Sequence, residues 1–336
     1  MEAKERYKVE TVSHSGLVAL SKSPVAYRGY KAREERSTAG MNLGSAIHCK
    51  VLEPNEFNKR YKVSKYEIPS GKNAVFVSTL YSTWAQSGLG SISEEYQEEW
   101  VTNAFEKSEL KGTPAKAWES FRGDTDSSKK LQKYWDYLEE SEGLFQLSPS
   151  DLETITACRG SIEHHKKAME LLYGYGLSDT YNELDIVWKH PKFKFKMRSI
   201  IDKLIVDSFT KTIMVVDLKT SAKDIHSFSQ PYTSYKYYRQ LPLYKEAAIW
   251  YAENELKLDI TEWAVESYIV GVQTTGHNEC AVYKPSNMDL IKGSAENLLM
   301  LERMEWHFEN NEWDYPKEYY EGDGALTLSI DAKDLI

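Results

Sequence analysis

Two aspartates and a lysine, placed in two neighbouring apolar stretches, are the residues of this chain whose types and spacing could do chemistry together. Asp202 lies in one mostly apolar run, and Asp217-Leu218-Lys219 ends the next. An acidic residue on one strand, followed by Asp-x-Lys on the next strand, is a minimal arrangement for metal-assisted cleavage of a phosphodiester. Most Asp-x-Lys triplets are solvated strand ends, and that alternative stands beside the catalytic one.

The spacing predicts how these residues meet. Asp217 and Lys219 are two positions apart, so on a strand their side chains share one face while Leu218 points into the core. Asp202 precedes Asp217 by 15 positions (217 − 202), enough for a strand, a turn near 207–211 and a return strand. We expect this hairpin to hold both aspartates at one Mg²⁺ or Mn²⁺, with the Leu218 carbonyl as another ligand. The Lys219 ammonium would ease proton loss from a nearby water and stabilise charge on the phosphate.

Two more residues could complete a metal site. His48 follows the small residues Gly44-Ser45-Ala46 on a predicted helix that ends before Pro54. Small residues let a helix approach a site closely, although a lone helical histidine is more often packed or solvated than bound to metal. Glu183 precedes the first clear strand of the chain. It is either an added ligand or a charged residue at the edge of the sheet.

A third group lies on a predicted helix within 231–251. Gln240 and Tyr244 are four positions apart and would share one helix face. Together with Arg239 they could hydrogen-bond a phosphate, and the alternative is an ordinary polar face. Pro242 lies between them and is costly inside a helix, which predicts either a first turn or a kink.

Composition bounds the classes of protein that the chain can belong to. It has 336 residues, 41% of them hydrophobic and 28% charged, so it can bury a sizeable core. The net charge of −9 argues against a protein that coats DNA non-specifically, but it allows an enzyme with a local basic groove. The three cysteines are far apart, which excludes a disulfide framework and favours a reducing cytoplasm. No stretch is apolar enough for a membrane span, and Met1–Glu10 lacks a signal peptide's apolar region.

The order of predicted elements indicates a mixed α/β fold. A helix start at Ser148-Pro149-Ser150-Asp151 opens one long amphipathic helix that ends at Gly174. Strands follow from Glu183, including one predicted from the alternation of apolar and basic residues over 192–198. A helix, a strand over 263–273 and a late helix over 291–308 complete the pattern. We expect three parts: an N-terminal helical part with His48 (1–60), a helical insertion or peripheral region (61–147) and a core with a mixed central sheet flanked by helices (148–336).

Taken in order, these residues resemble the PD-(D/E)XK exonucleases of the RecE (exonuclease VIII) type. The similarity touches most of the chain except about 61–143. The segments that carry it are Ser13 to Tyr27, Leu43-Gly44-Ser45-Ala46-Ile47-His48, Val51-Leu52-Glu53-Pro54, Glu183 with Trp188, Asp202, Asp217-Leu218-Lys219-Thr220, Gln240 with Tyr244, and Glu312-Trp313-Asp314-Tyr315-Pro316.

The resemblance implies a restriction-endonuclease-like core and Mg²⁺-dependent degradation of linear double-stranded DNA from 5′ to 3′. By position it makes His48, Asp202 and Asp217 metal ligands, Lys219 the residue that activates water, and Gln240 and Tyr244 the Gln-x-x-x-Tyr motif. It also implies a ring of subunits around DNA, a single-strand annealing protein as partner, and a phage or prophage setting in a bacterial cytoplasm. The alternatives are a single-strand exonuclease, a structure-specific endonuclease and an inactive DNA-binding module.

Overall fold

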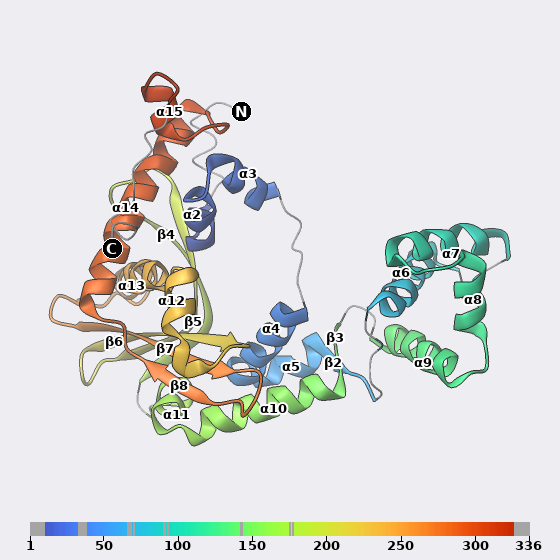
Figure 1. Ribbon diagram of the computed structural model, residues 1–336. Helices are drawn as coiled ribbons and strands as arrows, with labels where there is room; N and C mark the ends of the chain where they lie inside the picture. The colour runs from blue at the N-terminus through green and yellow to red at the C-terminus, as the bar shows by residue number, and fades with distance from the viewer. Residues whose placement is uncertain are drawn as a thin grey trace, which may run out of the picture. The chain divides into compact units, whose positions relative to one another are not determined.

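The computed structural model describes residues 11–32, 39–65, 69, 71–89, 92, 94–141, 144–174, 176 and 178–325 of the chain (Figure 1). The expectation made for Met1–Glu10 therefore lies outside the described residues. The chain divides into two compact units. Unit 1 comprises Met1–Thr38 with Gly160–Ile336, and unit 2 comprises Ala39–Arg159.

A six-stranded mixed sheet forms the centre of unit 1. The strand order is β1-β5-β6-β7-β8, and β4, which lies outside this order, also pairs with β5. The pairs β1/β5 and β6/β7 are parallel, and the pairs β4/β5, β5/β6 and β7/β8 are antiparallel. The strands are β1 (Thr11–Val12), β4 (Asp179–Lys189), β5 (Lys196–Asp207), β6 (Thr212–Ser221), β7 (Ala264–Gln273) and β8 (Cys280–Tyr283).

The expected hairpin is present, and its two strands separate beyond their paired region. The β5/β6 ladder runs from Asp207↔Thr212 to Lys203↔Val216. At its closed end the Asp207 side chain accepts hydrogen bonds from two backbone amides of the turn, which fixes the reversal of the chain. Past Val216, β6 continues only beside β7, with which it stays paired as far as Ser221↔Gln273. Asp202 and Asp217 are the first residues beyond the β5/β6 ladder.

Helices cover this sheet and bury its apolar residues. Leu204 and Val215 on the strands pack with Ala247 of α13 and Met304 of α14 in one core cluster, and all four are buried. The alanines of α13 let that helix lie close to the sheet, and α14 packs on α13. The helices are α2 (His14–Leu20), α3 (Pro24–Ala32), α11 (Lys166–Tyr173), η1 (Ile225–Ser227), α12 (Ser229–Ser234), α13 (Tyr237–Asn254), α14 (Asn287–Asn310) and α15 (Lys317–Glu321). The prediction of a mixed central sheet flanked by helices is confirmed.

Two predicted elements differ from the observed ones. The strand predicted from alternation over 192–198 begins only at Lys196, because the chain turns at Pro191 and Lys192. Phe193 and Phe195 are nevertheless buried, and their rings stack with centroids 5.5 Å apart. The alternation of apolar and basic residues therefore indicates which side chains are buried here, although these residues do not form a strand. The long helix predicted from Pro149 is two helices, α10 (Pro149–His164) and α11. His165 separates them, since its Nδ1 accepts from the Ala168 amide at 3.2 Å and caps α11.

Unit 2 is largely helical. Aromatic side chains of α6 to α9 form its core cluster, among them Phe76, Trp100 and Tyr134. The Tyr137 hydroxyl links α9 to two short parallel strands, which were not expected from the sequence, by bonding to the backbone of Lys62 and Leu147. The elements are α4 (Ala39–Leu52), α5 (Pro54–Arg60), β2 (Tyr61–Val63), α6 (Lys72–Ser87), α7 (Glu94–Ser108), α8 (Pro114–Arg122), α9 (Asp126–Glu140) and β3 (Phe145–Leu147).

Among the residues that the structure describes, no helix combines the length and the apolar character that a bilayer crossing requires.

Candidate functional site

Asp217 and Lys219 form a buried ion pair on β6. The Lys219 Nζ lies 2.7 Å from Asp217 Oδ1. The Asp217 side chain is fully buried, and the Lys219 side chain is 17% exposed. The two side chains therefore share a face of the strand, as the spacing predicts, and the intervening Leu218 is buried in the core. Lys219 is therefore the more accessible residue of this pair.

Asp202 reaches across the gap between β5 and β6. Its Oδ2 accepts a hydrogen bond of 2.7 Å from the backbone amide of Leu218. That amide lies just beyond the last β5/β6 ladder pair, so the carboxylate replaces a partner that the ladder would otherwise supply. Because the N–H and C=O of a strand residue point to the same side, the Leu218 carbonyl also faces β5. The role of this carbonyl as a metal ligand stays a prediction.

Glu183 lies next to Asp202, on strand β4, which pairs with β5. It lies on β4 between the register pairs Asn182↔Lys203 and Leu184↔Ile201, directly beside Asp202. A carboxylate oxygen of Glu183 is within 4.8 Å of one of Asp202. The backbone of Glu183 has φ of 47°, which is rare for a residue with a side chain and is costly within a strand. Two carboxylates at this separation repel each other, and a cation between them would relieve the repulsion.

Burial and the neighbouring charges together determine the protonation of Lys219 and Tyr244. Burial alone would lower the pKa of Lys219, but the carboxylates of Asp217 and then Asp202 outweigh it and hold that pKa above its ordinary value. Burial, followed by the nearby Asp217 charge, raises the pKa of the Tyr244 phenol. At neutral pH Lys219 is therefore an ammonium and Tyr244 a neutral phenol.

Helix α13 places Gln240 and Tyr244 against the carboxylates. Gln240 Nε2 donates to the Tyr244 hydroxyl at 2.7 Å, as their spacing of one helical turn allows. Tyr244 is 9% exposed and close enough to Asp217 and Lys219 to interact with both charges. Pro242 is the sixth residue of α13, so the prediction that it lies in a first turn is wrong, and the kink stays a prediction.

The Arg239 side chain is buried. Its side chain is 2% exposed, and its Nε donates to Asn297 Oδ1 at 3.1 Å on α14. Glu296 of the same helix is 3.9 Å away. The structure thus gives Arg239 protein partners on α14, where the sequence suggested a contact with phosphate.

His48 lies in unit 2, on α4, and is half-buried. It belongs to a different compact unit from the carboxylates on β4, β5 and β6. Its role as a metal ligand stays a prediction.

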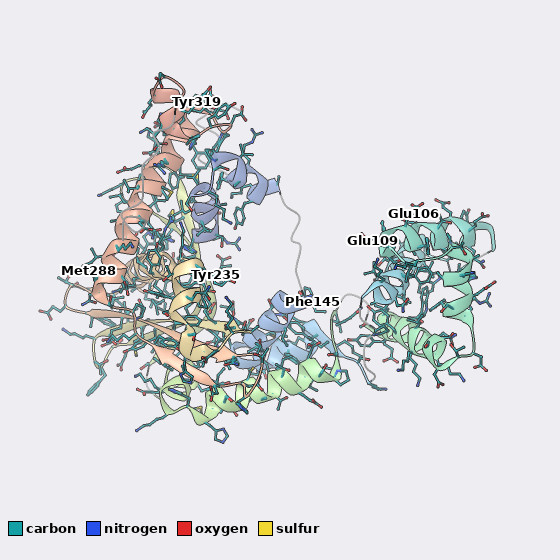
Figure 2. All side chains as sticks on the ribbon, viewed as in Figure 1. Glu106, Glu109, Phe145, Tyr235, Met288 and Tyr319 are labelled. Atoms are coloured by element: carbon teal, nitrogen blue, oxygen red, sulfur yellow. The ribbon has the colours of Figure 1, made fainter. Side chains whose placement is uncertain are left out.

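Further side chains lie near Lys219. The Tyr237 ring lies 5.0 Å from the Lys219 Nζ, and Phe228 stacks on Tyr237 at 5.9 Å. His14 of α2 is close to Arg239, Lys219 and Lys236; burial first, and then these cations, lower its pKa to about 3. The sequence signal for Tyr237 is a segment rich in tyrosine, whose spacing allows stacking on bases or an ordinary protein interface: Tyr232, Tyr235, Tyr237 and Tyr238. Tyr235 is its exposed member, at 62% (Figure 2). His14 carried no such signal.

Comparisons with known proteins add little to this geometry. No protein-family model matches the chain, and a search of curated proteins finds no match. The chain is similar to a solved structure from Eubacterium rectale described as a "putative exonuclease", with 13% identity, a TM-score of 0.35, and coverage of 90% of this chain and 98% of that one. A second chain, named SSO0001, shares 12% identity with a TM-score of 0.24, over 66% of this chain and 85% of that one. Both likenesses are too distant to assign a function.

Proposed function

We propose that the chain is a metal-dependent nuclease that hydrolyses phosphodiester bonds. The observation that carries this proposal is the buried Asp217–Lys219 pair, held next to Asp202 by the bond from the Leu218 amide. A carboxylate group with one lysine at its accessible edge matches the needs of phosphodiester hydrolysis, where a metal and a cation must share the charge of one phosphate.

The donor set fits a hard divalent cation. Glu183 and Asp202 bring two carboxylates within 4.8 Å, and Asp202 also bonds the backbone of Leu218, whose carbonyl is a further oxygen donor nearby. Oxygen donors of this kind favour Mg²⁺, with Mn²⁺ as a substitute. We infer that Asp202, Asp217 and the Leu218 carbonyl hold the ion, with His48 and Glu183 as further ligands. A bound ion would supply Lewis acidity to an oxygen of the scissile phosphate.

The residues of the chain then have separate tasks. Lys219 stays protonated because of Asp217, so it acts as a cation beside the attacking water rather than as a base. Its charge makes proton loss from that water easier and stabilises the phosphate as negative charge builds up. Tyr244 and Gln240, which are hydrogen-bonded to each other, position the scissile phosphate next to Asp217. Attack by water forms one P–O bond and breaks the bond to the 3′ oxygen, leaving a 5′-phosphate and a 3′-hydroxyl.

The finer substrate assignment rests on the ordered motifs of the sequence. We propose exonuclease action on ends of linear double-stranded DNA, from 5′ to 3′, in recombination of a phage or prophage within the bacterial cytoplasm. We further propose that subunits assemble as a homo-oligomeric ring around the DNA and act with a single-strand annealing protein. Arg239 is kept as a candidate phosphate contact, since Asn297 binds only its Nε and its buried Nη2 has no hydrogen-bond partner among the described residues.

Digestion of end-labelled linear duplex, with and without Mg²⁺, tests the proposal. We expect Mg²⁺-dependent release of labelled products from linear duplex and no action on closed circular duplex. Digestion that continues in excess chelator would contradict the metal requirement.

The same assay separates the alternatives. Preference for single strands would identify a single-strand exonuclease, and cutting of closed circles or of branched DNA would identify an endonuclease. Binding of DNA with no cleavage in either Mg²⁺ or Mn²⁺ would identify an inactive binding module.

A further inference from the structure

Helix α13 has a defect in the turn that carries Gln240. Pro242 has no backbone N–H, so the carbonyl four residues earlier, that of Tyr238, lacks its usual helical donor. The proline ring also crowds that carbonyl. At this point α13 therefore has one helical hydrogen bond fewer to hold its geometry, and a contact from a neighbouring element can influence it.

Gly293 of α14 lies against this carbonyl. A Cβ added to Gly293 would be 2.0 Å from the Tyr238 oxygen, 2.8 Å from its carbonyl carbon and 3.2 Å from the Arg239 Cα. These are backbone atoms, which cannot rotate away as the end of a side chain could. Only glycine allows α14 to lie this close to the Tyr238 carbonyl, and the requirement comes from space rather than from the backbone angles of Gly293.

Asn297 holds the next residue of α13 from the same face of α14. Its Nδ2 donates to the Arg239 carbonyl at 2.7 Å, and its Oδ1 accepts from the Arg239 Nε at 3.1 Å. Asn297 is 2% exposed, so both bonds are protected from water. The adjacent Glu296 accepts from the Tyr238 hydroxyl at 2.8 Å. Two consecutive residues of α13 are thus attached to α14.

These attachments come immediately before Gln240. Gln240 donates to Tyr244, and Tyr244 lies beside Asp217 and Lys219. A shift of Tyr238 and Arg239 along or around α13 would therefore move the Gln240–Tyr244 pair relative to the carboxylates. A displacement of about 1 Å is enough to reduce a rate about 100-fold when it affects groups that align a reacting phosphate.

We propose that Gly293 and Asn297 of α14 are positioning residues that set where Gln240 and Tyr244 lie against the Asp217–Lys219 pair. The role assigned to Gln240 and Tyr244 rests on the proposed function, whereas the mechanical coupling of α14 to α13 does not. Both levels can be measured separately.

Gly293→Ala is the main variant. We expect the cleavage rate at saturating DNA to fall about tenfold or more, while the KM for DNA changes less than about threefold, because alignment rather than binding is lost. Adding Pro242→Ala supplies an N–H that can bond the Tyr238 carbonyl and hold it within α13, away from the new Cβ. The double variant should therefore recover at least half of the lost rate on a logarithmic scale, a recovery that a general packing defect would not show.

A spectroscopic measurement tests the coupling without relying on activity. With 3-fluorotyrosine incorporated in place of Tyr244, the ¹⁹F resonance should shift in Gly293→Ala and return towards its original position in the double variant. The matched control is Gly29→Ala in α3, where a Cβ meets nothing within 4 Å and where rate and resonance should not change.

The outcomes separate the two levels of the proposal. An unshifted resonance in Gly293→Ala, or no recovery with Pro242→Ala, would overturn the positioning role. If the wild-type chain does not cleave DNA, the proposed function fails and the resonance alone decides the coupling. Should Gly293→Ala not fold, Asn297→Ala removes the two bonds without adding atoms, and its resonance must shift in the same way for the proposal to stand.

Discussion

The backbone amide of Leu218 donates to the side chain of Asp202 over 2.7 Å, at the point where β5 and β6 stop pairing. One bond thus serves two purposes. It satisfies an amide that the end of the ladder leaves without a strand partner, and it fixes one oxygen of Asp202 to the strand that carries Lys219. The remaining oxygen of Asp202 is oriented by the same contact.

Asp202→Asn should separate these two purposes. The amide oxygen of asparagine can still accept from Leu218, so the free energy of unfolding should change by less than about 1 kcal/mol. The lost negative charge should lower Mg²⁺-dependent cleavage on the order of 100-fold or more. Chemical denaturation and single-turnover cleavage measure the two effects.

The comparison variant is Asp202→Ala, which removes the acceptor as well. It should lose cleavage to the same extent and, in addition, about 1–3 kcal/mol of stability, because the buried Leu218 amide is left without its partner. Equal stability of the two variants would show that this hydrogen bond is not formed in solution.

Lys219→Met should damage both stability and activity, for separable reasons. It leaves the fully buried Asp217 carboxylate without its cation, which costs about 3–5 kcal/mol when one partner of a buried pair is removed. Adding Asp217→Asn removes the stranded charge and should restore most of that loss, as measured by urea denaturation without metal. Neither variant should cleave DNA. A double variant no more stable than Lys219→Met would contradict the buried pairing.

Divalent metal should stabilise unit 1 through the paired carboxylates. At a Mg²⁺ concentration about 100 times its Kd, stabilisation is about 2.7 kcal/mol, or roughly 5–10 °C in Tm for a domain of this size. Glu183→Gln removes one charge of the pair and should reduce this shift, which differential scanning calorimetry can record. Glu262→Gln, which alters an exposed carboxylate on a loop before β7, is the matched control and should keep the full shift. A shift unaffected by Glu183→Gln would place the ion elsewhere.

His14 should make the fold sensitive to moderate acid. Burial and the cations Arg239, Lys219 and Lys236 lower its pKa in the folded state from 6.5 to about 3. Below about pH 6.5 His14 is therefore protonated in the unfolded chain, whereas in the folded chain it stays neutral down to about pH 3. The free energy of unfolding keeps its full His14 contribution above about pH 6.5 and falls as the pH drops towards 3. At pH 5 the loss is about 2 kcal/mol.

His14→Asn tests this dependence, because asparagine does not titrate. The difference in unfolding free energy between pH 7.5 and pH 5 should be smaller by about 2 kcal/mol in the variant than in the wild-type chain. Identical pH dependence of both proteins would show that His14 is already protonated, or freely protonated, in the folded state.

The hairpin that carries Asp202, Asp217 and Lys219 could be predicted because its signals are local. Apolar runs gave the two strands, and a spacing of two residues gave the shared face of Asp217 and Lys219. Glu183 was recognised only as a candidate, since its place beside Asp202 depends on the register of β4, which no local pattern encodes. The coarse class of the fold followed from the order of the elements.

Contacts between distant segments could not be predicted in this way. Gly293 in α14 looks like an ordinary helix-weakening glycine until the Tyr238 carbonyl is placed next to it. Similarly, His165 interrupts a continuous helical pattern only because its ring caps the following helix, a choice that the periodicity of apolar residues does not report. Alternating burial around Phe193 and Phe195 imitated a strand because two stacked rings fill the core from a turn.

The position of β6 within the sheet has a consequence for the durability of the site. β6 is hydrogen-bonded to β7 along its whole length and to β5 over its first half, so its amides should be among the last in unit 1 to exchange with solvent deuterium. Local opening that exposes the ends of helices would leave Asp217 and Lys219 in place. These two residues should lose their arrangement only when unit 1 unfolds as a whole, so heat inactivation and global unfolding should coincide.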